Sequence, residues 1–324
     1  MSERSGRLGR IFTYLNAQFP PAVMLPSGVA TFLALHWSLQ ALAGQEPLVF
    51  GARAIVGALT ITLFMAILRV YDELKDAESD RRLAAAGDPR YMDRPIVTGE
   101  ITEGDLHVLR HTITALMLLM NLPLLLLGKW FYPALGFAAA YLATWLSFKW
   151  YFWPKIKTSL LLALLTHNPL TVVLQAYVLT LFLQEFTLAG PRWGLALICF
   201  GMWFPITAWE TCRKIRLPDM ETDYETYSKV FGGWRRAAVV PAFLILVSAG
   251  CVLALSRQIG LGPVFWGVLG VAALVPVGAV LRLQLQPTPA ATKLRPFVEV
   301  YVVVAQAGLA IALGVTRGVT WRPW

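Results

Sequence analysis

Nine apolar stretches, each long enough to cross a lipid bilayer, constrain this chain more than any other feature of its sequence. Hydrophobic residues make up 57% of the 324 residues and charged residues only 15%, with a mean hydropathy of +0.59. A helix of about 20 apolar residues spans the hydrocarbon core and satisfies its own backbone hydrogen bonds there. We therefore predict an all-α, polytopic membrane bundle of nine transmembrane helices. Its predicted spans are residues 20–43, 51–71, 107–128, 130–150, 158–184, 192–212, 237–256, 262–283 and 294–316.

The basic residues are unevenly distributed between the two sides of this predicted bundle. If the N-terminus lies inside, the inner segments are the N-terminal tail and the loops after the second, fourth, sixth and eighth spans. Positive charge gathers on the cytoplasmic side of membrane proteins, so we expect these segments to be cytoplasmic, in a bacterial inner membrane. The net charge of +9 then reflects topology and attraction to anionic lipid, and not nucleic acid. Only six of the 28 Lys and Arg residues fall outside: Arg53, Lys129, Arg192, Arg257, Arg317 and Arg322.

The N-terminal tail lacks the pattern of a cleaved signal peptide. Arg4, Arg7 and Arg10 precede Ile11 and Phe12, but no short apolar core with a small-residue cleavage site follows them. We therefore expect the first span to insert as a permanent helix.

The acidic pattern Asp-x-Glu-x-Asp occurs twice, at residues 76–80 and 219–223. Carboxylates are scarce in this chain, with 19 in 324 residues. Each copy lies near the start of one of the two longest inner loops, about 72–106 and 213–236. Acidic clusters at a membrane edge are unfavourable unless cations hold them together. Divalent metals, which take hard oxygen ligands, are the cations that suit such clusters.

Helical spacing places the first cluster on one face of a helix. Glu73, Asp76 and Asp80 follow an i, i+3, i+7 pattern, and Asp72 lies four residues before Asp76. Like charges at this spacing repel each other unless a divalent ion or a basic group lies between them. The alternative interpretation is a solvated helix end whose acids pair with nearby basic residues.

The second cluster follows the sixth span. Asp219 and Asp223 are four residues apart and share a helix face if the helix continues past Pro218. Two matching clusters on the inner side, four helices apart, favour binding sites over two solvated helix ends. Asp88 and Asp105 lie in the first loop but outside the pattern, so we expect them to be dispensable. The basic neighbours that would pair with solvated helix ends are Lys75, Arg81, Arg82 and Arg216.

The offset between the clusters indicates an internal pseudo-repeat of four helices. Helices 1–4 and 5–8 would be the two repeats, with a ninth helix added, in a single domain of residues 1–324. Two acidic faces with basic residues between them suit a diphosphate bridged by Mg²⁺, because Mg²⁺ binds few protein carboxylates and shares its remaining shell with phosphate oxygens. Metal ions neutralise a leaving diphosphate, and Lys or Arg donors stabilise the charge that develops on it.

These segments resemble the motifs of the UbiA superfamily of intramembrane prenyltransferases. The family's first motif, Asn-Asp-x-x-Asp-x-x-x-Asp, aligns with residues 72–80, and residues 92–102 are similar to its Asn-Arg-Pro…Pro-Ile…Ser-Gly-x-Ile-Ser stretch. The second motif, Asp-x-x-Asp-x-x-x-Asp, aligns with residues 216–223, and residues 227–232 resemble the Lys-Thr…Gly segment after it. The resemblance covers essentially the whole chain. It implies nine helices with a cytoplasmic cap made by the loops after helices 2 and 6.

The chain departs from the family motifs at three positions. Asp72 stands where the family usually has Asn, and Glu73 where it has Asp. Arg216 stands where the second motif usually has Asp, so one acid is gained in the first site and one is lost in the second. Arg216 could contact a diphosphate directly or pair with Glu210. The diphosphate chemistry is therefore better supported than transfer to an aromatic acceptor.

By this resemblance, a polyprenyl diphosphate enters from the bilayer with its tail in the bundle, and two Mg²⁺ ions hold its diphosphate. The expected catalytic and metal-binding residues are Asp72, Glu73, Asp76 and Asp80 for one ion and Asp219 and Asp223 for the other. The expected diphosphate donors are Arg94, Lys214, Arg216 and Lys229.

Ionisation of such a substrate would leave an allylic carbocation inside the bundle. Aromatic faces stabilise a cation by roughly 0.5–2 kcal/mol each, and the loops would cap the site and exclude water. Most aromatic residues near the inner edge are expected to belong to the interfacial belt or to helix packing. The candidates are Trp145, Phe148, Trp150, Tyr151, Phe152 and Trp209.

Three functions follow from these patterns, in decreasing order of support. The first is transfer of the prenyl group to a lipophilic acceptor, and the second is cyclisation of the substrate, as in the terpene-cyclase branch of the superfamily. The third is cation transport, which would need polar groups strung through the bilayer, and the set present is sparse. The sequence indicates no obligatory protein partner. The mid-membrane polar residues are Asn121, His167, Asn168 and Glu299, of which His167 fits helix packing better than substrate contact.

Overall fold

The computed structural model describes residues 6–188, 193–221 and 225–323, without the side chain of Arg90. Within these residues, nine helical segments are long and apolar enough to cross a membrane. The predicted all-α bundle is confirmed, and the chain is an integral membrane protein. The segments are α2 (Pro21–Leu42), α3 (Ala52–Ala85), Glu103–Leu126, α7 (Phe131–Phe148), Leu160–Glu185, α11 (Trp193–Cys212), α13 (Trp234–Gln258), α14 (Pro263–Leu285) and Arg295–Arg317.

Three of the nine segments are built from shorter helices. Glu103–Leu126 joins α6 (Glu103–Asn121) to the 3₁₀ turn η1 (Leu122–Leu126). The segment Leu160–Glu185 consists of α9 (Leu160–His167) and α10 (Leu170–Glu185), and Pro169 separates them because its ring removes a backbone donor. The last segment joins α15 (Arg295–Val303), the π-helical turn η4 (Val304–Gly308) and α16 (Leu309–Arg317).

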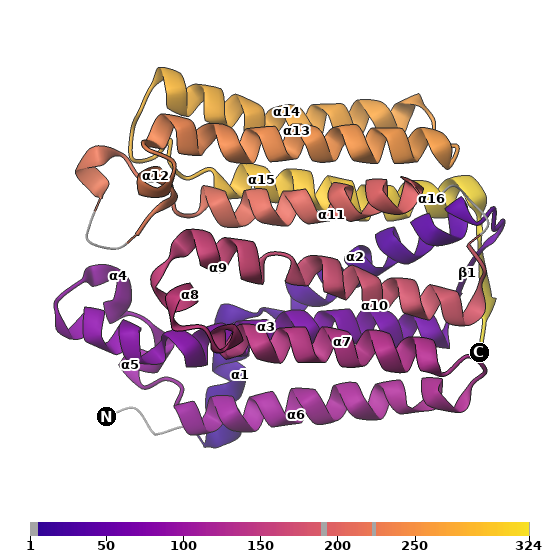
Figure 1. The fold of residues 1–324 in the computed structure, drawn as a ribbon, viewed down its shortest axis with the longest axis horizontal. Helices are drawn as coiled ribbons and strands as arrows, with labels where there is room; N and C mark the ends of the chain where they lie inside the picture. Colours follow the sequence, from indigo (N-terminus) through magenta and orange to yellow (C-terminus); the bar gives the residue numbers. More distant parts are fainter. Residues whose placement is uncertain (1–5, 189–192, 222–224, 324) are drawn as a thin grey trace.

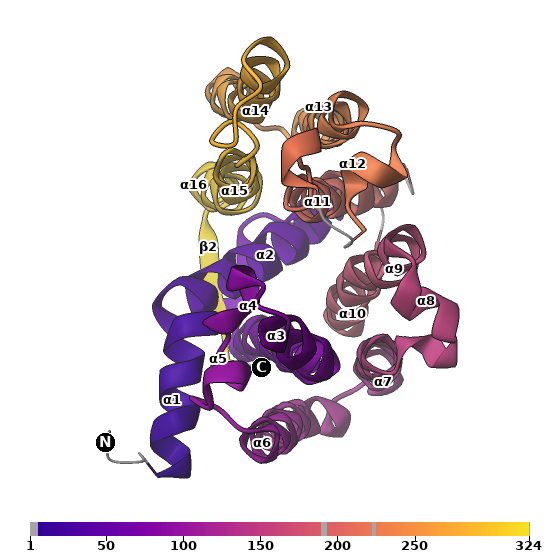
Figure 2. The same ribbon diagram turned by 90° about the vertical axis from the view of Figure 1, so that its left-hand side faces the viewer.

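The spans lie side by side along the long axis of the molecule (Figure 1). We call one end of the bundle the loop end, because the short helices α4 (Pro89–Met92), α5 (Pro95–Thr98), α8 (Pro154–Thr158) and α12 (Tyr227–Val230) lie there. The N-terminal helix α1 (Arg7–Gln18) also lies toward this end, and it crosses the bundle instead of running along it (Figure 2).

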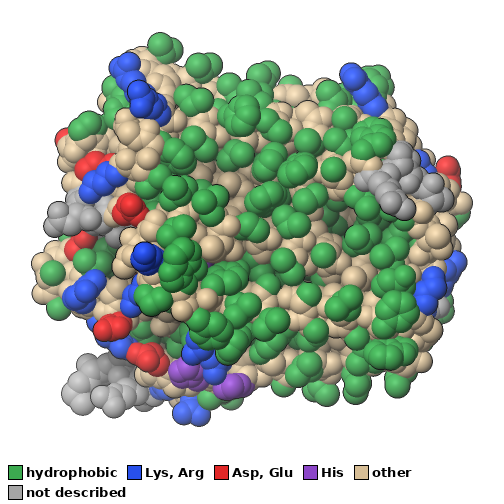
Figure 3. Space-filling model, viewed as in Figure 1, with side chains coloured by type: hydrophobic (Ala, Val, Ile, Leu, Met, Phe, Trp, Pro, Cys, Tyr) green, Lys and Arg blue, Asp and Glu red, His purple; other side chains and the backbone are tan. Residues whose placement is uncertain are grey.

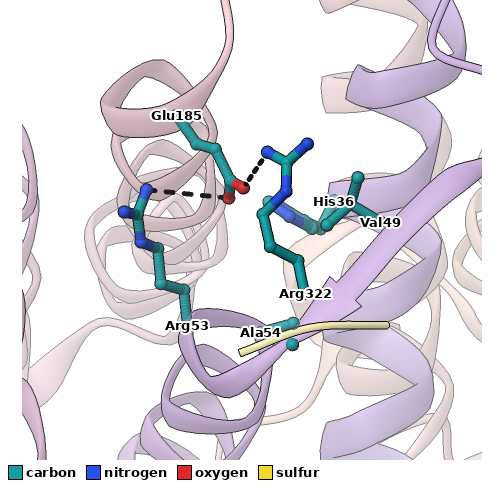
Figure 4. Close-up of a pocket in the computed structure, with 7 residues that line it drawn as sticks. His36, Val49, Arg53, Ala54, Glu185 and Arg322 are labelled. Atoms are coloured by element: carbon teal, nitrogen blue, oxygen red, sulfur yellow. Dashed lines mark hydrogen bonds and ion pairs between the residues drawn. The ribbon is translucent and has the colours of Figure 1, made fainter. Parts of the chain in front are cut away.

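The opposite end, which we call the strand end, carries β1 (Leu48–Gly51) and β2 (Val319–Arg322), paired in parallel. Glu185 at the end of α10 lies between two arginines there, 2.8 Å from Arg322 and 3.8 Å from Arg53 (Figure 4). A cavity of about 10 Å³ beside these residues has room for about one water molecule and is also lined by the buried His36. Arg53 and Arg322 belong to the six basic residues expected outside, so the strand end corresponds to the predicted outer side.

The surface between the two ends is apolar. Figure 3 shows hydrophobic side chains along the length of one face, with charged side chains gathered toward its ends. Leu119, Leu135, Val271 and Ile311 are 65–66% exposed, and each belongs to a different span. Large apolar side chains that face outward on several helices are unfavourable in water and suit a hydrocarbon environment.

Helix α3 is longer than the sequence analysis expected. The predicted membrane span ended at residue 71, and the acidic pattern was expected to lie on a helix face at the start of an inner loop; the helix runs without a break to Ala85. Its 34 residues make it about 51 Å long, which exceeds the roughly 30 Å hydrocarbon core. Residues 72–85 are rich in Glu, Lys, Arg, Leu and Ala, all good helix formers, so the helix continues into the polar zone. The first acidic cluster therefore lies on a rigid helix.

Candidate functional site at the loop end

The first acidic cluster lies on the last turns of α3. Glu73 and Asp80 are buried, at 2% and 5% exposure, whereas Asp72 and Asp76 are exposed. One continuous helix carries all four residues, which confirms the expected i, i+3, i+7 arrangement. Buried carboxylates at a membrane edge need partners. The surrounding basic side chains neutralise part of their negative charge.

The two acids that depart from the family motif are each paired with a cation of the same helix. Lys75 Nζ lies 3.1 Å from Asp72 Oδ1, and Arg69 Nη2 donates to Glu73 Oε2 over 2.7 Å. The side-chain carboxylates of Asp76 and Asp80 have no hydrogen bond or ion pair with any residue that the structure describes. The two acids that match the family motif therefore keep their carboxylates available, and the extra charge of the motif is neutralised locally.

Two of the predicted diphosphate donors lie near this cluster. Arg94, which precedes α5, is within electrostatic range of Glu73 and Asp80. Lys214, which follows α11, is within electrostatic range of Asp76 and also lies 3.6 Å from Glu210. The segment after the sixth span and the acidic end of α3 are distant in the sequence but lie at the same end of the bundle (Figure 1). Together they supply both acidic and basic side chains to this region.

The second cluster does not form the helix face that its spacing suggested. Helix α11 ends at Cys212, the 3₁₀ turn η3 covers Pro218–Met220, and Glu221 has an extended backbone with ψ 144°. Pro218 cannot donate a backbone hydrogen bond to a continuing helix, so the condition for a shared face fails. Asp219 is exposed on the turn, and Asp223 lies outside the residues that the structure describes.

Of the two alternatives for Arg216, the structure does not show the pairing with Glu210. Its Nη1 donates to the backbone carbonyls of Arg213 and Ile215, over 3.4 and 3.1 Å. Glu210 instead pairs with Arg213 over 3.0 Å and with Lys214. The reason is helical geometry, because Arg213 and Lys214 lie three and four residues after Glu210 and Arg216 lies beyond the helix end.

The loop after α11 is held by its own polar side chains. The backbone N–H of Arg216 donates to Ser228 Oγ, which in turn donates to the Arg216 carbonyl, over 2.8 and 2.9 Å. Thr226 donates to both carboxylate oxygens of Glu221, and Lys229 Nζ lies 4.0 Å from the same carboxylate. Glu221, the central acid of the second pattern, therefore stabilises the loop conformation through these contacts. Lys229, a predicted diphosphate donor, belongs to the same loop.

Aromatic side chains surround the other side of the α3 cluster. Lys75 Nζ lies 4.3 Å from the centre of the Trp150 ring, and Trp150 and Tyr151 each pack edge-on against His167. Residues 150–152 form the turn η2, and all three have φ values of 51–59°. This left-handed conformation is unfavourable for bulky residues, so tertiary contacts must hold it.

His167 is engaged in packing, as the sequence analysis favoured. Its Nε2 lies 3.0 Å from the Ser147 carbonyl, and its Nδ1 lies within 3.1 Å of the Ala163 carbonyl and the Thr166 hydroxyl. Trp209, another aromatic candidate, donates to Glu299 over 2.9 Å. Among the aromatic candidates, Trp150 is tied most directly to the acidic cluster, through Lys75.

Sequence reasoning missed Arg69 and Tyr14 of this site, and it named Lys75 only as an ion-pair partner in the alternative interpretation. Arg69 and Lys75 balance the acids, and their spacing of four and three residues from Glu73 and Asp72 was a usable signal. Tyr14 of α1 lies buried within electrostatic range of Arg69 and Glu73, and burial raises the pKa of its phenol above the ordinary value. No local pattern could place α1 against α3.

The carboxylate oxygens of the α3 cluster fit Mg²⁺ bound together with a diphosphate. Among the described residues, no three His, Cys, Asp or Glu side chains converge as a complete metal site. Mg²⁺ commonly takes one or two protein carboxylates and fills its shell with water and substrate phosphates. The carboxylates of Asp76 and Asp80 are available, and Glu73 Oε1 is buried without a hydrogen-bond partner. These hard oxygens match such an ion.

Comparisons with known proteins agree with the architecture. No protein-family model and no curated protein matches this chain. Among solved structures, the chain is similar to the apo structure of a UbiA homolog from Aeropyrum pernix K1, with a TM-score of 0.61 and 17% sequence identity. The match covers 88% of this chain and 98% of that chain. The chain therefore has a UbiA-like fold, as the motif resemblance implied.

Proposed function

We propose that this chain is a member of the UbiA superfamily and a Mg²⁺-dependent intramembrane prenyltransferase. It would ionise a polyprenyl diphosphate and transfer the prenyl group to a lipophilic acceptor. The observation that carries the proposal is that Lys214, from the segment after α11, lies within electrostatic range of Asp76 on α3. The neighbourhoods of both motifs thus lie at the same end of an apolar bundle, and the UbiA-like fold supports the proposal.

The acids of α3 divide into two groups with different roles. Asp76 and Asp80 offer carboxylates without partners among the described residues, so they would hold Mg²⁺ against the diphosphate. Bound Mg²⁺ would neutralise the charge of the leaving diphosphate. Asp72 and Glu73 are paired with Lys75 and Arg69. Asp72 would tune the charge of the site, whereas Glu73, whose Oε1 has no hydrogen-bond partner, would also contribute to holding the ion. Asp219 and Asp223 are the proposed residues for a second ion.

The cations of the loop end would bind the diphosphate. Arg94 and Lys214 approach the α3 acids from two different segments, which suits a diphosphate placed between them. Donors fixed where charge develops stabilise the transition state without reorganisation. Arg216 and Lys229 are the further proposed donors. Lys229 Nζ lies 4.0 Å from the Glu221 carboxylate, and Arg216 Nη1 donates to backbone carbonyls of its own segment.

The apolar bundle would hold the isoprenoid tail. The proposed site lies where α3 leaves the bilayer, so a lipid substrate could keep its tail in the membrane and place its diphosphate in the loop region. We propose that the loop end is cytoplasmic, in a bacterial inner membrane, because the predicted positive-inside bias places it there. The substrate and the bilayer are the proposed partners.

Transport is less consistent with the structure. Asn121 donates to Thr60 over 2.8 Å and accepts from Tyr177 over 2.7 Å, deep in the bundle. Asn168 accepts hydrogen bonds from Trp203 and Thr207. These mid-membrane polar groups form hydrogen bonds with neighbouring helices, and such bonds commonly stabilise helix packing in membranes. They support packing more than a cation pathway.

Product analysis tests the proposed function. The purified protein is incubated with C15 or C20 prenyl diphosphate, Mg²⁺ and a membrane lipid extract, and both released diphosphate and the organic phase are measured. We expect Mg²⁺-dependent diphosphate release with a prenylated lipid product, and loss of both on chelation with EDTA. Failure to release diphosphate from either substrate under any Mg²⁺ concentration would refute the proposal.

A further inference from the structure

The helix α1 is joined to the acidic cluster by a single guanidinium nitrogen. Arg69 Nη2 donates to Gln18 Oε1 at the end of α1 over 2.7 Å, and it also donates to Glu73 Oε2 over 2.7 Å. These two bonds use both hydrogens of that nitrogen. A helix outside the nine spans therefore contacts a predicted metal-binding acid through one intermediate residue.

The position of α1 is fixed by a second set of contacts. Arg10 donates to Asp105 through Nε and Nη2, over 2.8 and 2.9 Å, and Arg7 adds a bond of 3.2 Å. Asp105 is itself held, because it forms a capping box with Thr102 at the start of α6. Tyr14 is buried at 2% exposure on the inner face of α1. Gln18 is thus presented to Arg69 from an anchored helix.

The side chain of Glu73 has one engaged and one unengaged oxygen. Its side chain is 1% exposed, and Oε1 is buried without a hydrogen-bond partner although Oε2 is held by Arg69. A buried carboxylate oxygen without a partner is unfavourable. Glu73 is carried by the same helix as Asp76 and Asp80, the two acids whose carboxylates are available to a cation.

We propose that Gln18 and Arg69 are positioning residues that orient Glu73. They hold Oε2 so that Oε1 is presented to a Mg²⁺–diphosphate complex. The inference rests on the proposed function, because it takes that complex as the ligand. Residues that orient metal ligands affect metal affinity about 10–100-fold when they are removed. Arg69 is suited to this role because its planar guanidinium can donate to two acceptors in a fixed geometry. A lysine ammonium, on a flexible stem, would hold them less rigidly.

Direct metal binding tests the positioning role. Mn²⁺ replaces Mg²⁺ as a paramagnetic probe and is titrated into the purified full chain with inorganic diphosphate, and free Mn²⁺ is followed by electron paramagnetic resonance. Gln18→Met keeps the side-chain length but removes the acceptor, and we expect it to weaken Mn²⁺ binding about 10-fold. Gln18→Glu keeps an acceptor oxygen and should restore binding. Asn16→Ala, at an exposed position of the same helix, is the matched control and should bind like the wild type.

Kinetic measurements distinguish a positioning role of Gln18 from a role in overall stability. Gln18→Met should raise the Mg²⁺ concentration for half-maximal diphosphate release about 10-fold, with most of kcat retained at saturating Mg²⁺ and with an unchanged thermal unfolding midpoint. A Gln18→Met variant that binds Mn²⁺ like Asn16→Ala would overturn the proposal, as would wild-type protein that binds no Mn²⁺ with diphosphate. Normal Mn²⁺ titrations without any turnover of prenyl diphosphate would instead refute the proposed reaction and leave the positioning role supported.

Discussion

Lys75 Nζ lies 3.1 Å from Asp72 Oδ1, one turn apart on α3, and the same ammonium stacks on the ring of Trp150. Asp72 stands where the family motif usually has Asn, so the extra negative charge has a partner built into the helix. The Lys75 side chain is only 8% exposed, whereas that of Asp72 is 53% exposed. The pair therefore offsets a motif departure while leaving Asp76 available.

A double-mutant cycle at this pair tests whether Lys75 compensates the negative charge of Asp72. Lys75→Met alone should lower kcat/KM about 2–5-fold, because a partly exposed ion pair is worth about 0–1 kcal/mol. Asp72→Asn alone restores the family residue and should be tolerated. The double variant should recover most of the loss, since the uncompensated charge is then gone. Equal losses in Lys75→Met with and without Asp72→Asn would mean that Lys75 acts through Trp150 or the substrate instead.

The available acids of α3 should be essential for turnover. Asp76→Asn and Asp80→Asn remove charge while keeping the side-chain shape, and each should reduce diphosphate release by about 100-fold or more. Glu100→Gln provides the control, because Glu100 is an exposed acid after α5. Thermal unfolding and gel filtration in detergent should be unchanged in all three. Comparable losses in Glu100→Gln would point to a general defect of the loop end.

Arg216 can be tested by restoring the family residue. Arg216→Asp adds a possible metal ligand but removes a proposed donor, so we expect diphosphate affinity or turnover to fall about 10-fold at saturating Mg²⁺. Arg216→Met separates the two effects, because it removes the donor without adding an acid. Turnover that is equal to the wild type in Arg216→Asp would assign Arg216 to the backbone contacts with Arg213 and Ile215 alone.

The spans could be predicted from the sequence because hydropathy is a local property with a fixed length scale. Predicted spans such as 192–212 and 262–283 agree with Trp193–Cys212 and Pro263–Leu285 to within two residues. The apolar span 51–71 covered only the first part of α3, because the helix continues through the acidic pattern at residues 72–80 and ends at Ala85. At the second cluster, Pro218 outweighed the i, i+4 spacing of the acids.

Contacts between distant segments were beyond local patterns. Asp105 was expected to be dispensable, yet it is fully buried and accepts bonds from Arg7, Arg10 and Thr102. Its substitution should therefore destabilise the packing of α1 on α6, and it does not serve as a neutral control. Likewise, Gln18 and Arg69 are 51 residues apart, and only the crossing of α1 over the bundle brings them together.

The acceptor distinguishes prenyl transfer from cyclisation, which share the ionisation step. A transferase positions its nucleophile before or during ionisation, so it gains little rate when the acceptor is missing. A cyclase carries its nucleophile within the substrate. We predict that purified protein with Mg²⁺ and C15 or C20 prenyl diphosphate alone releases diphosphate slowly, and that a membrane lipid extract stimulates release about 10-fold or more.

The control for this experiment is the Asp76→Asn variant, which should release little diphosphate with or without the extract. Stimulation of the wild type by the extract, with the prenyl group recovered in a larger lipid, supports transfer. The available carboxylates of Asp76 and Asp80 serve ionisation in either reaction, so only the fate of the carbocation separates the two. Rapid release without extract, with a cyclic hydrocarbon or alcohol in the organic phase, would assign the chain to the terpene-cyclase branch.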